Sequence, residues 1–494
     1  MKIKNRSTII LMLTLLLLGC SSKDIHYYSA DESALHTRGG VLGDNGIYHD
    51  VLYNPESVAL NFDGFIVGLD KSPRTLIGAG DDNYRAQPQE GMSRVIRRLD
   101  KDYKTHYISH IIHDRGLPYG RENCAVYSVY NPSPLFPHDV AAAERAASPL
   151  FSFCPPAQSS NASPISHTVP PRQAFEGSRE GLQALKTALL ASIDEHNRSG
   201  HPYTHAIVVV MGWNTPQIEA IRNFNSIMSH LDAVARQQNQ PFNPLFVGVT
   251  WSSYWDENWF DVAVRLASYP NKADDADEIG ASWLGSIVDT VHSTINQRGK
   301  NRPEAIPLIA IGHSFGARAV SMAVCQGPQF RVPASPVRTQ GSPVVDLFIG
   351  LEPAVSLRRF LTGSVEKIQY NDCAAAKHIV MTASRYDSAV SSSLWVDMVG
   401  NAFVYQRTCE DNKSDRVSCK TACANGDIVD GAGQCGTAKP VTALNSPITY
   451  IDASRLIRFN QPNTGGNAHS DIYRPDTGKF IWNAISAASH SGAK

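Results

Sequence analysis

Short apolar runs alternate with amphipathic segments along the C-terminal two thirds of the chain. The runs at 205–213, 245–251 and 306–312 are brief and rich in β-branched residues, which is typical of buried strands. In segment 275–295, apolar residues recur at three- and four-residue steps, which predicts an amphipathic helix. Strands that alternate with helices form a parallel sheet covered on both faces. The pattern therefore predicts an α/β fold with a mostly parallel sheet.

The N-terminal third is less regular. Fragments such as 57–70 and 107–112 have strand-like composition, but Gly, Pro and Asp turns interrupt them and no catalytic motif lies there. Segment 155–172 is rich in Pro, Ser and Asn, so it is either a linker or a long surface loop. We therefore divide the chain into an N-terminal extension, residues 20–172, and an α/β domain, residues 173–494.

The composition of the 494 residues is that of a globular protein, with 42% hydrophobic and 18% charged residues. The formal net charge is −1, and no Lys- or Arg-rich run is present. Nucleic-acid binding needs a basic surplus on some face of the protein. We therefore expect no nucleic-acid partner.

The first residues have the composition of an export signal. Basic residues in MKIKNR precede an apolar stretch of roughly ten residues, which is shorter than the roughly 20 that cross a bilayer. The motif LLGC, which ends at Cys20, resembles the lipobox of bacterial lipoproteins; this implies that residues 1–19 form a signal peptide and that Cys20 carries lipid. Two serines follow Cys20, and a mature chain that begins in this way resembles lipoproteins sorted to the outer membrane. We expect a lipid-anchored protein of the bacterial cell envelope, and a soluble secreted protein is the alternative.

An exported chain is expected to form disulfides because its compartment is oxidising. Eight cysteines remain besides Cys20, and an even number favours full pairing. Cys325 lies about 16 Å down the helix predicted after Ser314, and Cys373 precedes a strand that starts at the same far face, so these two should pair. The other expected pairs are Cys124 with Cys154, by elimination, and two pairs within the group Cys409, Cys419, Cys423 and Cys435.

That group of four lies in a Cys-rich insertion at 406–437. A zinc site is the alternative to disulfides there, but no close Cys-x-x-Cys pair is present. A helix at 390–404 should carry the chain to the face opposite Ser314, so we expect the insertion far from that serine. The acidic residues at 274–278 stand at the start of a helix, where the helix dipole explains them, so we expect no metal site.

The segment IPLIAIGHSFGARAV at 306–320 contains a Gly-x-Ser-x-Gly motif centred on Ser314. The motif alone is weak, but its surroundings meet the demands of a nucleophile elbow: a buried strand, a tight turn flanked by glycines, and an immediate helix. Residues 307–311 are the strand, Gly312 and Gly316 are the small flanks, and a helix begins at 317. Ser314 is therefore the candidate nucleophile.

With this elbow, residues from about 200 to 490 resemble the α/β-hydrolase family, in which the triad follows the chain order Ser, acid, His. The resemblance implies that the base is His469, in the glycine-bearing loop after the last strand. His313 beside the nucleophile should point away from the attacking oxygen, and in the family a histidine there is not the base. We expect His313 to be a packing residue.

The resemblance also implies an acid on a loop after an intervening strand. Asp387 follows the strand 378–384 and is the favoured acid, although it could instead cap a helix. Glu352 follows the preceding strand, where some relatives carry their acid, and is the alternative. Asp397 is a further alternative.

An oxyanion hole needs two N–H donors. The expected donors are the amides of Phe315, after the nucleophile, and Trp213, in the loop MGWN after strand 205–210. That loop keeps the glycine of the family's His-Gly-x pattern but has Met in place of His. Further aromatic residues follow strand 245–251 and form a possible substrate pocket or plain core packing. These pocket candidates are Trp251, Tyr254 and Trp255.

The sequence thus predicts a lipid-anchored serine hydrolase, esterase-like or lipase-like, that cleaves carboxylic ester or thioester bonds through an acyl-enzyme. Ser314, His469 and Asp387 are the expected triad, and the chemistry needs neither a metal nor an organic cofactor. The expected partners are a small-molecule or lipid ester and the membrane that holds the anchor. Peptidase and acyltransferase activities stay open. The alternative from another class is an inactive hydrolase-fold lipoprotein that serves as a binding or scaffold module.

Overall fold

The computed structural model describes most of the chain from residue 171 onwards and four short segments before it. The expected signal segment 1–19, Cys20, the pocket candidates Tyr254 and Trp255, and the alternative acid Asp397 lie outside the described residues. The described ranges are 59–71, 106–116, 123–128, 152–154, 171–213, 215, 217–251, 253, 273, 275–299, 305–328, 343–361, 363–365, 368–370, 373–390, 398–411, 416–459 and 468–491.

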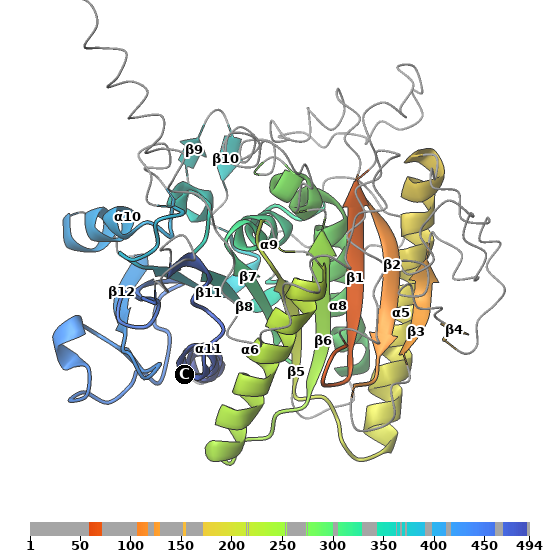
Figure 1. The fold of residues 1–494 in the computed structure, drawn as a ribbon, viewed down its shortest axis with the longest axis horizontal. Helices are drawn as coiled ribbons and strands as arrows, with labels where there is room; N and C mark the ends of the chain where they lie inside the picture. Colours follow the sequence, from red (N-terminus) through yellow and green to blue (C-terminus); the bar gives the residue numbers. More distant parts are fainter. Residues whose placement is uncertain are drawn as a thin grey trace, which may run out of the picture.

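A twelve-stranded mixed sheet is the centre of the described structure, with the strand order β13-β12-β14-β11-β8-β7-β5-β6-β1-β2-β3-β4 (Figure 1). The strands from β12 through β1 are all parallel to their neighbours. The pairs β1–β2, β2–β3 and β12–β13 are antiparallel, and β4 pairs in parallel with β3. Their bounds are β1 (Gly64–Lys71), β2 (His106–Asp114), β3 (Asn123–Ser128), β4 (Ser152–Phe153), β5 (His205–Val210), β6 (Pro244–Trp251), β7 (Leu308–His313), β8 (Val345–Leu351), β11 (Ala376–Ala383), β12 (Val417–Ala422), β13 (Ile428–Val429) and β14 (Ile448–Asp452).

Helices cover both faces of this sheet, as the alternating pattern predicts. On the central strand β5, residues 206, 208 and 210 face α5, α8 and α9, whereas residues 207 and 209 face α6 and α11. Figure 1 shows α6 and α11 crossing one face. Within the described residues, no helix is both long and apolar enough to cross a membrane. The bounds are α5 (Pro171–Arg198), α6 (Gln217–Gln237), α8 (Gly285–Gly299), α9 (Phe315–Cys325), α10 (Ala402–Gln406) and α11 (Pro475–His490), with single turns η3 (Gly280–Leu284), η4 (Leu357–Phe360), η6 (Arg407–Asp411), η7 (Ala432–Gln434) and η8 (Ala468–Ser470), and a separate hairpin of β9 (Gly363–Val365) and β10 (Ile368–Tyr370).

The N-terminal strands belong to the same sheet as the rest of the chain. β1 lies parallel to β6, with Phe65 opposite Val247, and β2 to β4 extend the sheet beyond it. The side chains of Phe65 and Val67 are fully buried in the core that α5 and α8 also share. The proposed division between 20–172 and 173–494 falls inside α5 and therefore does not separate two cores.

The segment around residue 400 differs from the expected helix at 390–404. Met398 and Asn401 form isolated bridges with Ser356 and Ser384, at the carboxyl ends of β8 and β11, and α10 begins only after Asn401. The side chain of Asn401 accepts a hydrogen bond from the Phe403 amide, which caps α10. The chain is thus still beside the carboxyl strand ends at Asn401, so the expected crossing does not occur there.

The Cys-rich insertion at 406–437 is part of the sheet edge. β12 pairs in parallel with β14, and β13 pairs with β12. The backbone at Gly426 packs closely against the first turns of α11. The insertion therefore spans the height of the sheet, which corrects the expectation that it lies wholly at the far face.

All of the expected cysteine pairings are present. Cys325 at the end of α9 bonds Cys373 ahead of β11, with a Cα–Cα distance of 4.4 Å. This agrees with the argument that the helix carries Cys325 to the end where the strand starts. The other disulfides are Cys124–Cys154, Cys409–Cys419 and Cys423–Cys435.

Candidate active site

The strand order reverses beside β5. The chain passes from β5 through α6 to β6 on one side, and then returns through η3 and α8 to β7 on the other side of β5. In open α/β sheets, ligands bind at the carboxyl ends of the strands where the order reverses. Gly212 and Ser314 follow the two strands that flank this point, so the sequence motif lies where the topology favours a site (Figure 1).

Ser314 occupies a strained turn between β7 and α9. Its backbone has φ 54° and ψ −123°, a conformation that L-residues rarely adopt and that often marks a functional position. The turn is possible because glycines flank it: a Cβ on Gly316 would collide with the carbonyl oxygens at the end of β5, and one on Gly312 with the backbone of Ala317. The structure thus has the elbow that the motif predicts, with Ser314 8% exposed.

The loop after β5 lies directly against this serine. A Cβ on Gly212 would be 2.7 Å from Ser314 Cβ and 3.3 Å from Ser314 Oγ, so only glycine fits there without a shift. Trp213 and Phe315, the expected oxyanion donors, have ring centroids 6.2 Å apart. Phe315 opens α9, and N–H groups in the first turn of a helix point out of its N-terminus.

Trp251, at the end of β6, contacts the same loop. It is 2% exposed, and its indole N–H donates a hydrogen bond of 2.9 Å to the carbonyl oxygen of Met211. Trp251 is therefore a core residue that supports the loop at 211–213, which agrees with the packing alternative for this position rather than with the pocket.

Asp387 and His469 form a short hydrogen bond. His469 Nδ1 lies 2.7 Å from Asp387 Oδ2, and the Asp387 carboxylate is fully buried. The other oxygen of Asp387 accepts from the Ala389 amide at 2.9 Å and the Val390 amide at 3.4 Å. Burial raises the pKa of Asp387. The charge of His469 and the hydrogen bonds to the carboxylate lower this pKa by more, so it lies below its usual value. Asp387 is thus suited to stay ionised and orient the imidazole.

His313 connects the elbow to the loop that carries His469. Its Nε2–H donates a hydrogen bond of 2.9 Å to the backbone carbonyl of His469, and the two rings have centroids 4.7 Å apart. Burial, together with the charge of His469, lowers the pKa of His313 to about 3. His313 is therefore a neutral donor that holds His469 beside the elbow, a contact that the sequence alone did not predict.

Glu352 contacts Asp387 rather than His469. It follows β8, is fully buried and also has a positive φ, 45°. Its carboxyl accepts hydrogen bonds from the Thr382 hydroxyl at 2.9 Å and the Ser384 amide at 3.1 Å, and burial, followed by the charge of the neighbouring Asp387, raises its pKa well above the usual value. Of the two proposed acids that the structure describes, Asp387 and Glu352, it thus places Asp387 against His469.

A buried ion cluster anchors the helix that starts at Ser314. Asp277 accepts from Arg318 at 2.5 Å and from Arg359 at 2.8 and 3.1 Å. Burial raises the pKa of Asp277, but the two guanidinium groups lower it by more, below its usual value. The acidic run at 274–278, which the sequence assigned to the helix dipole, thus provides an ion pair to the elbow helix. Nothing in the sequence indicated that Arg318, four residues after Ser314, and Arg359, in η4, would bind Asp277.

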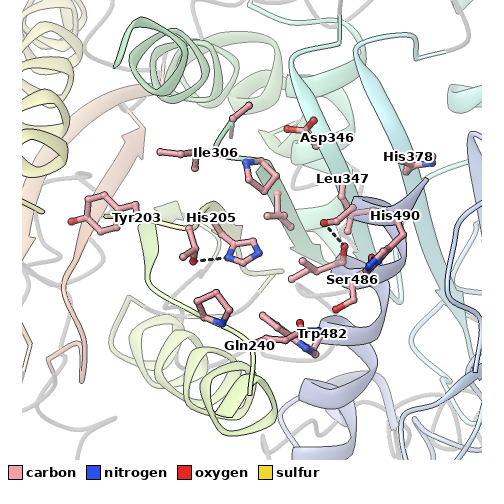
Figure 2. A pocket seen from close by; sticks show the side chains of 18 of the residues that line it. Tyr203, His205, Gln240, Ile306, Asp346, Leu347, His378, Trp482, Ser486 and His490 are labelled. Carbon is pink, nitrogen blue, oxygen red and sulfur yellow. Dashed lines mark hydrogen bonds between the residues drawn. The ribbon is translucent and has the colours of Figure 1, made fainter. Parts of the chain in front are cut away.

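A cavity of about 720 Å³ opens at the other edge of the sheet, at the amino ends of β5, β7, β8 and β11. Figure 2 shows His205, Ile306 and Leu347 lining it together with Trp482 of α11. Burial lowers the pKa of His205 to about 4. The length of β7 separates this cavity from Ser314 by about 20 Å, so it is not part of the site described above.

Among the residues that the structure describes, no three His, Cys, Asp or Glu side chains are grouped as a metal ion would require. The cysteines of the insertion are in disulfides. Comparison of the chain with protein-family models, with curated proteins and with solved structures finds no match.

Proposed function

We propose that this protein is a serine hydrolase of the α/β-hydrolase type that cleaves carboxylic ester or thioester bonds. The observation that carries the proposal is the hydrogen bond between His469 and Asp387, on a loop tied through His313 to the strained turn of Ser314. Nucleophile, base and acid come from three different strand ends, in the chain order that the family resemblance implies. A buried carboxylate against one imidazole nitrogen is the arrangement that leaves the other nitrogen to act as a base.

The proposed reaction follows from these positions. Ser314 Oγ attacks the carbonyl carbon of the substrate while His469 Nε2 takes the hydroxyl proton, and Asp387 stabilises the imidazolium that forms. The Phe315 and Trp213 amides hold the oxyanion. Collapse expels the alcohol or thiol, which receives the proton from His469 and leaves an acyl-Ser314 ester. Water then attacks this ester with His469 again as base, which releases the acid and restores Ser314.

We further propose an envelope location through a lipid anchor at Cys20, with a lipid or small-molecule ester as substrate. The four disulfides support an oxidising compartment. An envelope protein with Cys20→Ala should lose incorporation of a fatty-acid label and its membrane association. A label that persists in Cys20→Ala would contradict the anchor.

Labelling with a fluorophosphonate probe tests the hydrolase proposal. The purified protein should form a single covalent adduct on the peptide that contains Ser314, detected by mass spectrometry. Ser314→Ala should abolish the adduct, and Ser321→Ala, in the same helix, should leave it unchanged. Folded protein that takes no label would instead favour a binding or scaffold module.

A panel of esters with acyl chains of increasing length then defines the substrate. A preference for acyl chains of about eight carbons or more would indicate lipase-like activity. Turnover of peptides or acyl transfer to an alcohol, with indifference to all esters, would reject the ester assignment while keeping the triad.

A further inference from the structure

Two buried carboxyl groups lie side by side behind the candidate base. Asp387 and Glu352 are each fully buried and meet at the turn after β11, where the Glu352 carboxyl accepts from the Ser384 amide and the Asp387 amide donates to the Ser384 carbonyl. A hydrogen bond between two carboxyl groups needs a proton on one of them, because neither oxygen of a carboxylate can donate. Two neighbouring carboxylates in a buried site also repel each other too strongly for both to be charged. One of the two acids is therefore a neutral carboxylic acid.

The contacts decide which acid keeps the proton. Asp387 receives the N–H of His469 and the amides of Ala389 and Val390, so its negative charge is well compensated. Among the described residues, Glu352 receives a hydroxyl and one amide, and burial followed by the charge of Asp387 raises its pKa well above the usual value. The proton thus resides on Glu352.

The backbone also holds Glu352 in this position. Its positive φ turns the chain sharply after β8, as the positive φ of Ser314 does after β7. The Thr382 hydroxyl accepts from the Glu352 amide at 2.8 Å and donates to the Glu352 carboxyl, which fixes the side chain against β11. The turn at Gly400 covers the Glu352 backbone, where a Cβ would be 2.9 Å from the Glu352 carbonyl carbon. A residue held in a rare conformation by its surroundings often serves the site beside it.

We propose that Glu352 is a positioning residue, a neutral carboxylic acid that donates a hydrogen bond to Asp387 and so holds that carboxylate against His469. This inference rests on the proposed function, because it assigns to Glu352 a role in orienting the triad. Serine, base, acid and second acid then form a chain in which only Asp387 carries a charge before the reaction. When His469 takes the proton of Ser314, the negative charge of Asp387 faces the imidazolium, and Glu352 keeps its proton.

Two substitutions separate this role from that of a charged acid. Glu352→Gln keeps the shape and an N–H donor for Asp387, so kcat/KM should stay within about threefold of wild type and the midpoint of its acidic limb should not move. Glu352→Ala removes the donor, and kcat/KM should fall about ten- to hundredfold, as expected for a lost hydrogen bond to a charged group.

Three outcomes would overturn the proposal. If Glu352 is ionised in the active protein, Glu352→Gln removes a negative charge near His469, and the acidic limb moves to lower pH by about one unit. If the glutamine variant loses as much activity as the alanine variant, the amide does not replace the carboxyl as a donor. If Glu352→Ala retains wild-type kcat/KM, Glu352 has no positioning role.

A stability measurement tests the protonation state without any activity. The titratable groups that face Glu352 among the described residues are Asp387, after β11, and, through it, His469 of η8, whereas Thr382, Ser384 and Gly400 are neutral. An acid with a raised pKa in the folded state binds more protons there than in the unfolded chain, so stability falls as pH rises above about 4.3, the unfolded value, towards the raised pKa. Glu352→Gln should lack this part of the decline.

The urea midpoint of Glu352→Gln should therefore rise relative to that of wild type as pH increases through this window. A constant difference between the two would show that Glu352 is not protonated and would overturn the inference. If this shift is observed while wild type neither hydrolyses esters nor reacts with the fluorophosphonate, the proposed function fails and the neutral acid stands.

Discussion

The two edges of the parallel sheet differ in their chemistry, and the edge with the cavity described above is not the one with the candidate triad. The amino edge has a cavity of about 720 Å³, and the polar side chains there include a Lys377–Asp346 ion pair that is partly exposed. The carboxyl edge has a buried acid against a histidine, whereas non-glycine residues with positive φ occur at both edges: Ser314 and Glu352 at the carboxyl edge, and Asn239 and Cys373 before β6 and β11 at the amino edge. Buried, partnered charge identifies the candidate site, and neither empty space nor a positive φ alone does. The same sheet builds both edges, but only the carboxyl edge lies where the strand order reverses.

Removal of a histidine from each edge should give the largest contrast. His469→Ala should lower kcat/KM on the order of 10⁴-fold or more because the base is lost, and the protein should stay folded. His490→Ala, at the exposed end of α11 and on the cavity wall, is the matched control and should leave kcat/KM unchanged. A comparable loss in both variants would contradict the assignment of the chemistry to the carboxyl edge.

Breaking the ion cluster under the elbow should affect stability next most. Asp277→Ala removes the carboxylate that the buried Arg359 and the partly buried Arg318 share, and should lower the free energy of unfolding by about 3–5 kcal/mol in urea titrations. Because the pKa of Asp277 is lowered in the folded state, its contribution is present above about pH 4 and is lost as pH falls through the folded pKa. Asp232→Asn, in an exposed pair with Arg236, is the control and should change stability by less than about 0.5 kcal/mol.

A methyl group on the loop after β5 should disturb the oxyanion donors. Gly212→Ala would bring a Cβ against Ser314, so either the loop or the serine must move, and kcat should fall about 10²- to 10³-fold with KM little changed. Gly433→Ala has nothing within 4 Å of the new methyl group and serves as the control. Wild-type kcat in Gly212→Ala would show that the loop does not contribute to the transition state.

The smallest effect is expected at the amino edge. Lys377→Ala breaks a pair whose lysine side chain is 55% exposed, so stability should change by at most about 1 kcal/mol and kcat/KM should not change. Unfolding in urea and ester turnover measure the two quantities. A tenfold drop in kcat/KM would connect the cavity edge to the site and remove the contrast between the edges.

Local patterns were sufficient to predict the centre of the fold. The strand before Ser314 and the glycines around it are consecutive in sequence, so the elbow could be predicted without any long-range information. The Cys325–Cys373 disulfide followed from helix length and strand direction alone. His469 and Asp387 were expected only from the resemblance to the α/β-hydrolase family, and the structure brings their side chains together.

Contacts between distant segments could not be predicted in the same way. β1 pairs with β6 across a long stretch of chain, and nothing local in either strand names its partner. The bridges of Met398 and Asn401 replace an expected helix because tertiary pairing overrides an apolar pattern. The placement of Glu352 beside Asp387 depends on the register of β8 and β11, which local sequence patterns do not specify.

The pairing of β1 with β6 also affects how the chain can be assembled. Ribosomes add about 5–20 residues per second, so the roughly 180 residues between Phe65 and Val247 take about 10–35 s to synthesise. Until then β1 has no parallel neighbour, and its apolar side chains lack the core that later covers them. The first strand made thus waits for β6 before it can join the parallel part of the sheet, and a chaperone that shields it during this interval should raise the yield of folded protein.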